Sequence, residues 1–334
     1  MTEQFTCKTL LATYSSNKIV IYGPVSKTIC IKKGTVNYYI HIEQCISRTI
    51  KIESSEDVTV FTLNAILTKI ERLLMMFDGF FIPITSLKFT NSIIYSDHKL
   101  DLCGINLKST RLSYFESADF VLNRNNQLIE FEKVLTPEVF KKWEQLLENL
   151  DIVHQVYLYA LSNSTMPVDI KCSFLIETAE PLIEILQEQI ESFKPFSEEE
   201  ISLRKCLYIL ISKYGKEIFK KEITLYKDEF LTTLVSTRVR IMHIKKNQNK
   251  YYLNGSESLI YISKISLMYR KVIFTLLKIP ENLYNSNLLK YVNMLNNLNS
   301  TVDHFLVTLS NEKKEKHKYN RKYKRKYKRK YKRK

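Results

Sequence analysis

The sequence predicts an α+β protein with a β-rich N-terminal domain at residues 1–135, an all-helical domain at 136–310 and a disordered basic tail at 311–334. Residues 5–53 contain short runs of Val, Ile, Tyr and Thr bounded by Asn, Gly, Pro or Ser, which is the pattern of strands. After Val134, apolar residues recur at helical intervals in nearly every segment. The tail repeats Tyr, Lys and Arg and has too little apolar surface to pack into a core.

The N-terminal domain is predicted to be a meander or small sandwich with one inserted helix. Apolar residues between Val60 and Phe77 recur at roughly helical intervals, so this segment is the predicted helix. The predicted strands are 18–24, 28–34, 36–44, 47–53, 80–89, 91–96, 111–115, 119–123 and 127–134.

The helical domain is predicted to begin at Thr136, which suits a helix cap, followed by Pro137 at the first helical position. Gly, Asn and Pro residues then separate successive periodic segments. The predicted helices are 137–162, 167–193, 197–213, 227–246, 256–278 and 284–309.

Most of the positive charge of the chain lies in the tail. Residues 313–334 hold fifteen Lys or Arg and one Glu, so they carry +14 of the formal net charge of +16 and leave only +2 for residues 1–312. We expect the tail to be a nonspecific electrostatic arm for RNA, with Tyr rings that can stack on unpaired bases. The alternative is a solvated repeat without a binding role. The tail cations predicted to contact RNA include Lys322, Arg325, Arg329 and Arg333.

The six cysteines are widely spaced, without a C-x-x-C pair and without a His at metal-ligand spacing. We therefore expect buried thiols in a reducing, cytoplasmic compartment, with no zinc site, no other metal and no cofactor. The N-terminal stretch carries Glu3 and too short an apolar run for a secretory signal. No apolar run approaches the roughly 18 to 20 residues of a membrane span, so we expect no membrane association.

Residues 228–246 form the segment whose side chains are best suited to carry out chemistry. Asp228 suits the start of a helix and Lys246 its end, because of the helix dipole. Arg238 falls on the apolar stripe of this helix, eight residues after Phe230 and four after Leu234. Burying an unpaired guanidinium there costs several kcal/mol, so the head group must have a partner, face a cleft or reach solvent.

Arg238 and His243 form an R-x4-H pair late in a helical domain, and this pair resembles the signature of HEPN domains. The stretch from Phe230 to His243, the loop with Asn254 and Gly255 and the apolar helix that follows are similar to the ApeA-type subgroup of bacterial phage-defence proteins. Members of that subgroup also carry a β-rich domain ahead of the helical one. Taken alone, each residue is more often structural; the pair and the domain order together favour the resemblance.

The resemblance implies metal-independent RNA cleavage with Arg238 and His243 as catalytic residues. A His with a pKa near neutrality can move the proton of the 2′-hydroxyl or the leaving group, and Arg can hold charge that develops on the phosphate. The RNA's own 2′-hydroxyl would be the nucleophile, so the products would carry 2′,3′-cyclic phosphate ends. Arg240, Lys245 and Lys246 are the nearby cations expected to contact RNA.

Two features of the pair leave alternatives open. Many active members have a polar residue directly after the Arg, whereas this chain has Val239, so activity is weaker or Arg240, Asn247 or Asn249 supplies the contact. Residues i and i+5 also lie about 140° apart around a helix. Either the helix is broken near the pair or two chains build a composite site; the resemblance favours a homodimer.

The leading functional hypothesis is an RNA endonuclease, with tRNA as the substrate suggested by the family. It would halt growth when residues 1–135 sense a phage-derived trigger. One alternative is a non-catalytic HEPN-like interaction or nucleic-acid-binding module. Another is the toxin of a toxin–antitoxin pair, which the fused N-terminal domain makes less plausible.

Overall fold

A computed structural model describes residues 6–14, 24–45, 48–79, 84–90, 127–161, 166–196, 201–242, 251–297 and 301–314. Contacts divide the chain into two compact units. Unit 1 comprises Met1–Asp151, Leu161–Thr165 and Ile273–Asn287, and unit 2 comprises Ile152–Ala160, Met166–Val272 and Leu288–Lys334. An antiparallel sheet followed by helices confirms the predicted α+β class.

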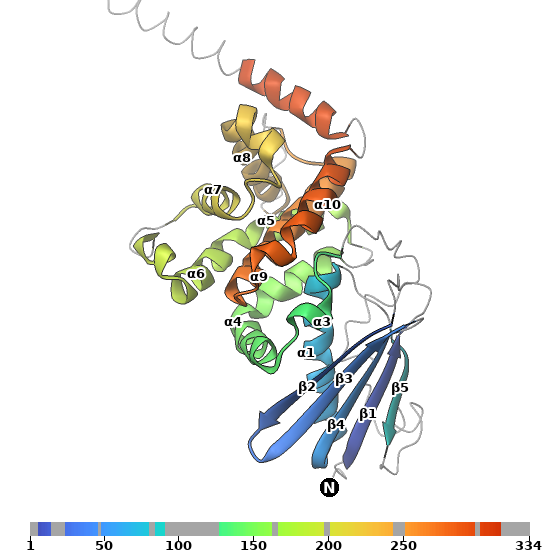
Figure 1. Cartoon of the computed structure of the whole chain (residues 1–334). Helices are drawn as coiled ribbons and strands as arrows, with labels where there is room; N and C mark the ends of the chain where they lie inside the picture. Colours follow the sequence, from blue (N-terminus) through green and yellow to red (C-terminus); the bar gives the residue numbers. More distant parts are fainter. Residues whose placement is uncertain are drawn as a thin grey trace, which may run out of the picture. The chain divides into compact units, whose positions relative to one another are not determined.

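Unit 1 is built on a five-stranded antiparallel sheet with the order β2-β3-β4-β1-β5 (Figure 1). The predicted strands at 28–34, 36–44 and 47–53 are confirmed as β2, β3 and β4, while the strands predicted between residues 91 and 123, and all of 18–24 except Pro24, lie outside the described residues. The strands are β1 (Thr6–Tyr14), β2 (Val25–Lys33), β3 (Val36–Gln44), β4 (Arg48–Thr59) and β5 (Ile84–Thr90).

Helix α1 (Val60–Asp78) packs against β1 and β4, as the apolar period predicts. Thr59 caps the helix by accepting a hydrogen bond from the Thr62 amide at 3.2 Å, and Gly79 ends it with a φ of 77° that favours glycine. Alternate side chains of the strands point to the same core as the apolar stripe of α1. The core they share includes Leu10, Ile40, Ile42, Ile50, Ile52, Leu63, Ile70, Leu74 and Phe77.

The strand predicted at 127–134 is wrong. Residues 127–130 have no regular structure and α3 (Phe131–Val134) is one helical turn. The amide of Leu128 donates to the carbonyl of Phe77 at 2.9 Å, so this segment completes the end of α1 instead of joining a sheet. The side chains of residues 128, 129 and 131 are all buried, whereas a strand with one exposed face would alternate buried and exposed side chains.

Helix α4 (Pro137–Leu161) begins where the sequence predicts, with the Val139 amide donating to Thr136 Oγ1 at 3.2 Å. Its first turns belong to unit 1: the indole of Trp143 donates to the Lys69 carbonyl at 2.8 Å, and Glu144 pairs with Lys33 at 2.5 Å. The contacts therefore group residues 137–151 with the sheet, and the domain boundaries at 135 and 310 stay predictions.

The remaining helices follow the predicted order with three corrections. The helix predicted at 284–309 is described as helical at Asn285–Asn297 and at 301–314, so residues 311–314 of the tail that was predicted to be disordered are helical. The helix predicted at 167–193 is split at Thr178, because Pro181 has no amide hydrogen to donate to the Glu177 carbonyl. The helix predicted at 227–246 starts earlier, at Lys220, and contains a kink. The described helices are α5 (Val168–Glu177), α6 (Ala179–Gln189), α7 (Leu203–Lys213), α8 (Lys220–Met242), α9 (Gly255–Leu276), α10 (Asn285–Asn297) and a final helix at 301–314.

Cysteine burial agrees with the expectation only in part. Cys7, Cys172 and Cys206 are buried, and burial raises the pKa of the Cys172 thiol to about 12. Cys30 and Cys45 are exposed. Cys30 lies on the face of β2 that points away from the core, and Cys45 directly follows the end of β3. Within the described ranges, no helix combines the length and apolarity needed to cross a bilayer.

Candidate functional site

Helix α8, which carries Arg238, consists of two helical halves. Tyr226 has non-helical angles, φ −134° and ψ 29°, and separates residues 220–225 from residues 227–242. The second half begins where the sequence analysis placed the start of the helix, since Asp228 and Glu229 suit that position. The first half is anchored separately: Lys264 on α9 pairs with Glu222 at 2.5 Å, and both side chains are fully buried.

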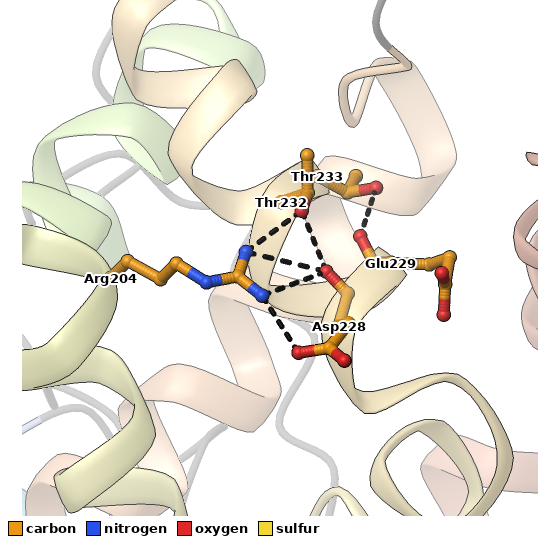
Figure 2. Close-up of polar contacts among 5 residues, drawn as sticks. All are labelled: Arg204, Asp228, Glu229, Thr232 and Thr233. Atoms are coloured by element: carbon orange, nitrogen blue, oxygen red, sulfur yellow. Dashed lines mark hydrogen bonds and ion pairs between the residues drawn. The ribbon is translucent and has the colours of Figure 1, made fainter. Parts of the chain in front are cut away.

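Arg204 on α7 holds the beginning of the second half. Its guanidinium lies between Thr232 and Asp228 in Figure 2 and donates to Thr232 Oγ1 at 2.8 Å and Asp228 Oδ1 at 2.9 Å. It also reaches the Asp228 carbonyl at 3.3 Å. The pair is well exposed, so its contribution to stability is about 0–1 kcal/mol, and its role is to orient the helix start.

The buried side of α8 is built from small polar and apolar side chains. Thr233 and Thr237 bond back to the carbonyls four residues earlier, which satisfies their hydroxyls inside the protein. Helix α5 packs against α8. The buried set after the kink comprises Glu229, Phe230, Leu231, Thr233, Leu234, Ser236 and Thr237.

Arg238 is paired with Glu177, the last residue of α5. Arg238 Nε donates to Glu177 Oε2, and Nη2 donates to Glu177 Oε1 at 2.6 Å, so the contact is bidentate. The two side chains keep 22% and 31% of their surface exposed, which places the pair at the protein surface and not in the core. The hydrogen bonds to Glu177 raise the pKa of Arg238, so the guanidinium stays charged.

Glu177 reaches Arg238 because the chain turns at this point. Pro181 ends α5 at Glu177 and starts α6, and this turn brings Glu180 near the same guanidinium. Burial, followed by repulsion from Glu177, raises the pKa of Glu180, and Arg238 opposes the shift. Glu177 was not predicted from the sequence as a site residue. Pro181 is the local signal that a helix ends at Glu177, four residues earlier.

Arg240 contacts an aromatic ring of the same unit, and its predicted role in RNA binding stays a prediction. Its guanidinium carbon lies 3.6 Å from the ring centroid of Tyr252, a cation–π contact within unit 2. The other predicted site residues lie outside the described residues: His243, Lys245, Lys246, Lys322, Arg325, Arg329 and Arg333.

Both ends of the stretch that contains His243 are fixed. His243 directly follows Met242, the last described residue of α8. On the other side, the Leu253 amide donates to Thr237 Oγ1 at 2.9 Å, one residue before Arg238. Asp169 on α5 accepts from the Gly255 amide at 2.8 Å and the Ser258 hydroxyl at 2.7 Å, which caps α9. The chain thus returns to Arg238 after passing His243.

The described side chains offer an Arg–carboxylate site and not a metal centre. Among them no group of three or more His, Cys, Asp or Glu is arranged to hold a metal ion. A guanidinium such as that of Arg238 can donate hydrogen bonds to an anionic oxygen, for example one of a phosphate.

One comparison with known proteins found a match to a family model. The family model described as Apea-like HEPN matches residues 159–283, a range that contains α5 to α9 and both residues of the R-x4-H pair. The comparisons with curated proteins and with solved structures found no match.

Proposed function

We propose, on the premise that this chain is an ApeA-type HEPN-domain protein, that it is a metal-independent RNA endonuclease. The observation that supports the proposal is the placement of Arg238 at the surface of unit 2, held by Glu177, four residues before the end of a helix that His243 follows. The resemblance to HEPN domains implies ribonuclease activity, which is the activity proposed for this chain.

In the proposed reaction, the 2′-hydroxyl of RNA attacks the adjacent phosphorus and expels the 5′-oxygen. His243 moves a proton, from the attacking hydroxyl or to the leaving oxygen. Arg238 stabilises the charge that develops on the non-bridging oxygens. The bond from phosphorus to the 5′-oxygen breaks, which leaves a 2′,3′-cyclic phosphate and a 5′-hydroxyl.

Glu177 has a positioning role in this proposal. It occupies the edge of the guanidinium formed by Nε and Nη2, so it fixes the plane and direction of the Arg238 fork. A guanidinium presents its five N–H donors in a rigid planar fork, so holding one edge of it orients the whole group. A preorganised fork loses less entropy when it meets a phosphate.

Replacing Glu177 with Gln should reduce the rate of cleavage by about 10-fold to 100-fold, because an amide has one acceptor oxygen and cannot accept from Nε and Nη2 as the two carboxylate oxygens do. The measurement is the initial rate on a fluorescent RNA, with kcat and KM determined separately; we expect the loss mainly in kcat. Glu188→Gln, an exposed change on α6 that removes the same charge, is the matched control. A faster Glu177→Gln chain would instead identify Glu177 as an inhibitor of Arg238.

Cleavage should continue in excess EDTA, since the proposed chemistry uses only Arg238, His243 and the RNA. Terminal analysis of the products should find cyclic phosphate at the 3′ side of each cut and a free 5′-hydroxyl. Complete loss of activity in EDTA, restored by Mg²⁺ or Mn²⁺, would contradict the proposal, as would 5′-phosphate products.

The biological role we propose is defence against phage by abortive infection. The sheet of unit 1 serves as the sensing or regulatory part, and the helical part acts on RNA, with tRNA as the first substrate to test. The protein acts in the cytoplasm as a homodimer through its helical part, which would bring two Arg238–His243 pairs together.

A second candidate function is a non-catalytic HEPN-like module that binds partners or nucleic acid. The observation that favours it is that Glu177 is bonded to Arg238 and Glu180 interacts with it electrostatically, so negative charge already offsets the guanidinium that a phosphate would bind. Val239, half-buried after Arg238, also supplies no polar group. Absence of cleavage together with retained RNA binding would identify this function.

A further inference from the structure

A group of lysines surrounds the kink of α8, on the part of the helix that precedes Arg238. Lys220, Lys221 and Lys227 are exposed on either side of Tyr226. Lys313 and Lys314, at the end of the final helix, complete the group. We call these five lysines the kink patch.

The final helix is fastened to the kink by specific contacts. Lys313 Nζ donates to the Leu225 carbonyl at 2.9 Å and lies 5.7 Å from the Tyr226 ring centroid. Lys221 pairs with Asp303 at 3.4 Å, nearer the start of the same helix. In the sequence, the basic repeat follows Lys314.

Aromatic and apolar surface accompanies the charge. Lys227 Nζ lies 3.8 Å from the ring centroid of Tyr208, and this ring remains 42% exposed. Leu225 is 59% exposed at the kink. Lysines interleaved with accessible aromatic rings are what sequence-independent surfaces for single-stranded nucleic acid use, because cations meet phosphates and rings stack on bases.

Nearby acidic side chains largely have their own partners. Asp228 pairs with Arg204, and Asp303 pairs with Lys221. Glu312, beside Lys313, is a half-buried acid within the patch. Lys220 and Lys227 therefore present positive charge on a body whose net charge is nearly neutral.

We infer that the kink patch binds the sugar–phosphate backbone of single-stranded RNA. This inference rests on the proposed function, because it supplies the path by which RNA reaches Arg238. Lys227 and Arg238 are eleven residues apart in one helix, which is about 16 Å along its axis. A strand held at the kink patch is thereby close to Arg238 along α8.

The test is binding by the full chain of a single-stranded RNA whose 2′-hydroxyls are all methylated, so that it cannot be cleaved. Lys220→Glu/Lys227→Glu is compared with the unchanged chain across a salt series by fluorescence anisotropy. If each lysine neutralises one phosphate, the slope of log affinity against log salt should fall by about 1.4. Affinity at low salt should fall by at least an order of magnitude.

Lys142→Glu/Lys290→Glu is the matched control, since both lysines are exposed and the net charge changes equally. Circular dichroism and thermal melting of both variants exclude unfolding, and Lys220→Gln/Lys227→Gln repeats the comparison without new acids. Equal affinities and slopes for the patch and control variants would overturn the inference. Binding is measured without chemistry, so loss of binding in the patch variant supports the inference even if the unchanged chain never cleaves RNA.

Discussion

RNA is expected to remain intact when it is incubated with the Arg238→Ala or His243→Ala chain under conditions in which the unchanged chain degrades it. Loss of a general acid–base residue typically costs about 10²-fold to 10⁴-fold in rate, and loss of a group that stabilises developing charge costs a similar amount. Arg238→Lys should also lose most activity, because an ammonium keeps the charge but cannot form the fork with Glu177. Rates on one RNA, together with toxicity in cells, measure the effect.

His304→Ala controls for the removal of an imidazole, because His304 is exposed on the final helix and has no role in the proposal. Arg238→Ala frees the carboxylate of Glu177 from its partner, but both groups are partly exposed, so the loss of stability should be about 1 kcal/mol or less. Melting curves would verify this. RNA degradation at the same rate by the unchanged chain and both variants would remove Arg238 and His243 from the catalytic assignment.

Lys264→Met is expected to lower the free energy of unfolding by about 3–5 kcal/mol, because it leaves the buried carboxylate of Glu222 without its cation. Lys264 Nζ and Tyr261 OH both donate to Glu222 Oε1, at 2.5 Å and 2.8 Å. Burial lowers the pKa of Lys264, and Glu222 opposes that shift. Urea denaturation followed by circular dichroism measures the change.

Glu222→Gln/Lys264→Met is the variant that separates pairing from packing. The amide oxygen of Gln can still accept from Tyr261, and neither replacement leaves a buried charge, so the double variant should be more stable than Lys264→Met alone. If the two replacements instead destabilise additively, the charges of Glu222 and Lys264 do not stabilise each other. Lys271→Met removes a neighbouring cation of α9 and serves as the comparison.

Several elements were predictable because their causes are local. Helix α1 follows from the apolar period between Val60 and Phe77, and α4 starts at Thr136 and Pro137 because a cap and a proline act within one turn. Strand β3 coincides with the predicted run at 36–44. Each of these signals depends on residues no more than about four positions apart.

The errors arose where distant backbone or side chains decide the outcome. Residues 127–134 alternate like a strand, yet Leu128 donates to Phe77 and all apolar side chains there are buried. No glycine or proline near Tyr226 indicates a kink there in the sequence. Lys313, which is 88 residues away from Leu225 in the chain, donates a hydrogen bond to the Leu225 carbonyl next to the kink.

By itself, the sequence determined the α+β class, the order of sheet and helices, the basic character of the tail and the R-x4-H pair, since periodicity, caps and spacing are written in neighbouring residues. Only the tertiary structure decided what Arg238 contacts. Its partner Glu177 lies 61 residues earlier, and the end of α5 at Glu177 and the packing of α5 on α8 bring the two together. The cost of leaving a partly buried guanidinium unpaired predicts that a partner exists, but only the three-dimensional fold determines which carboxylate fills that role.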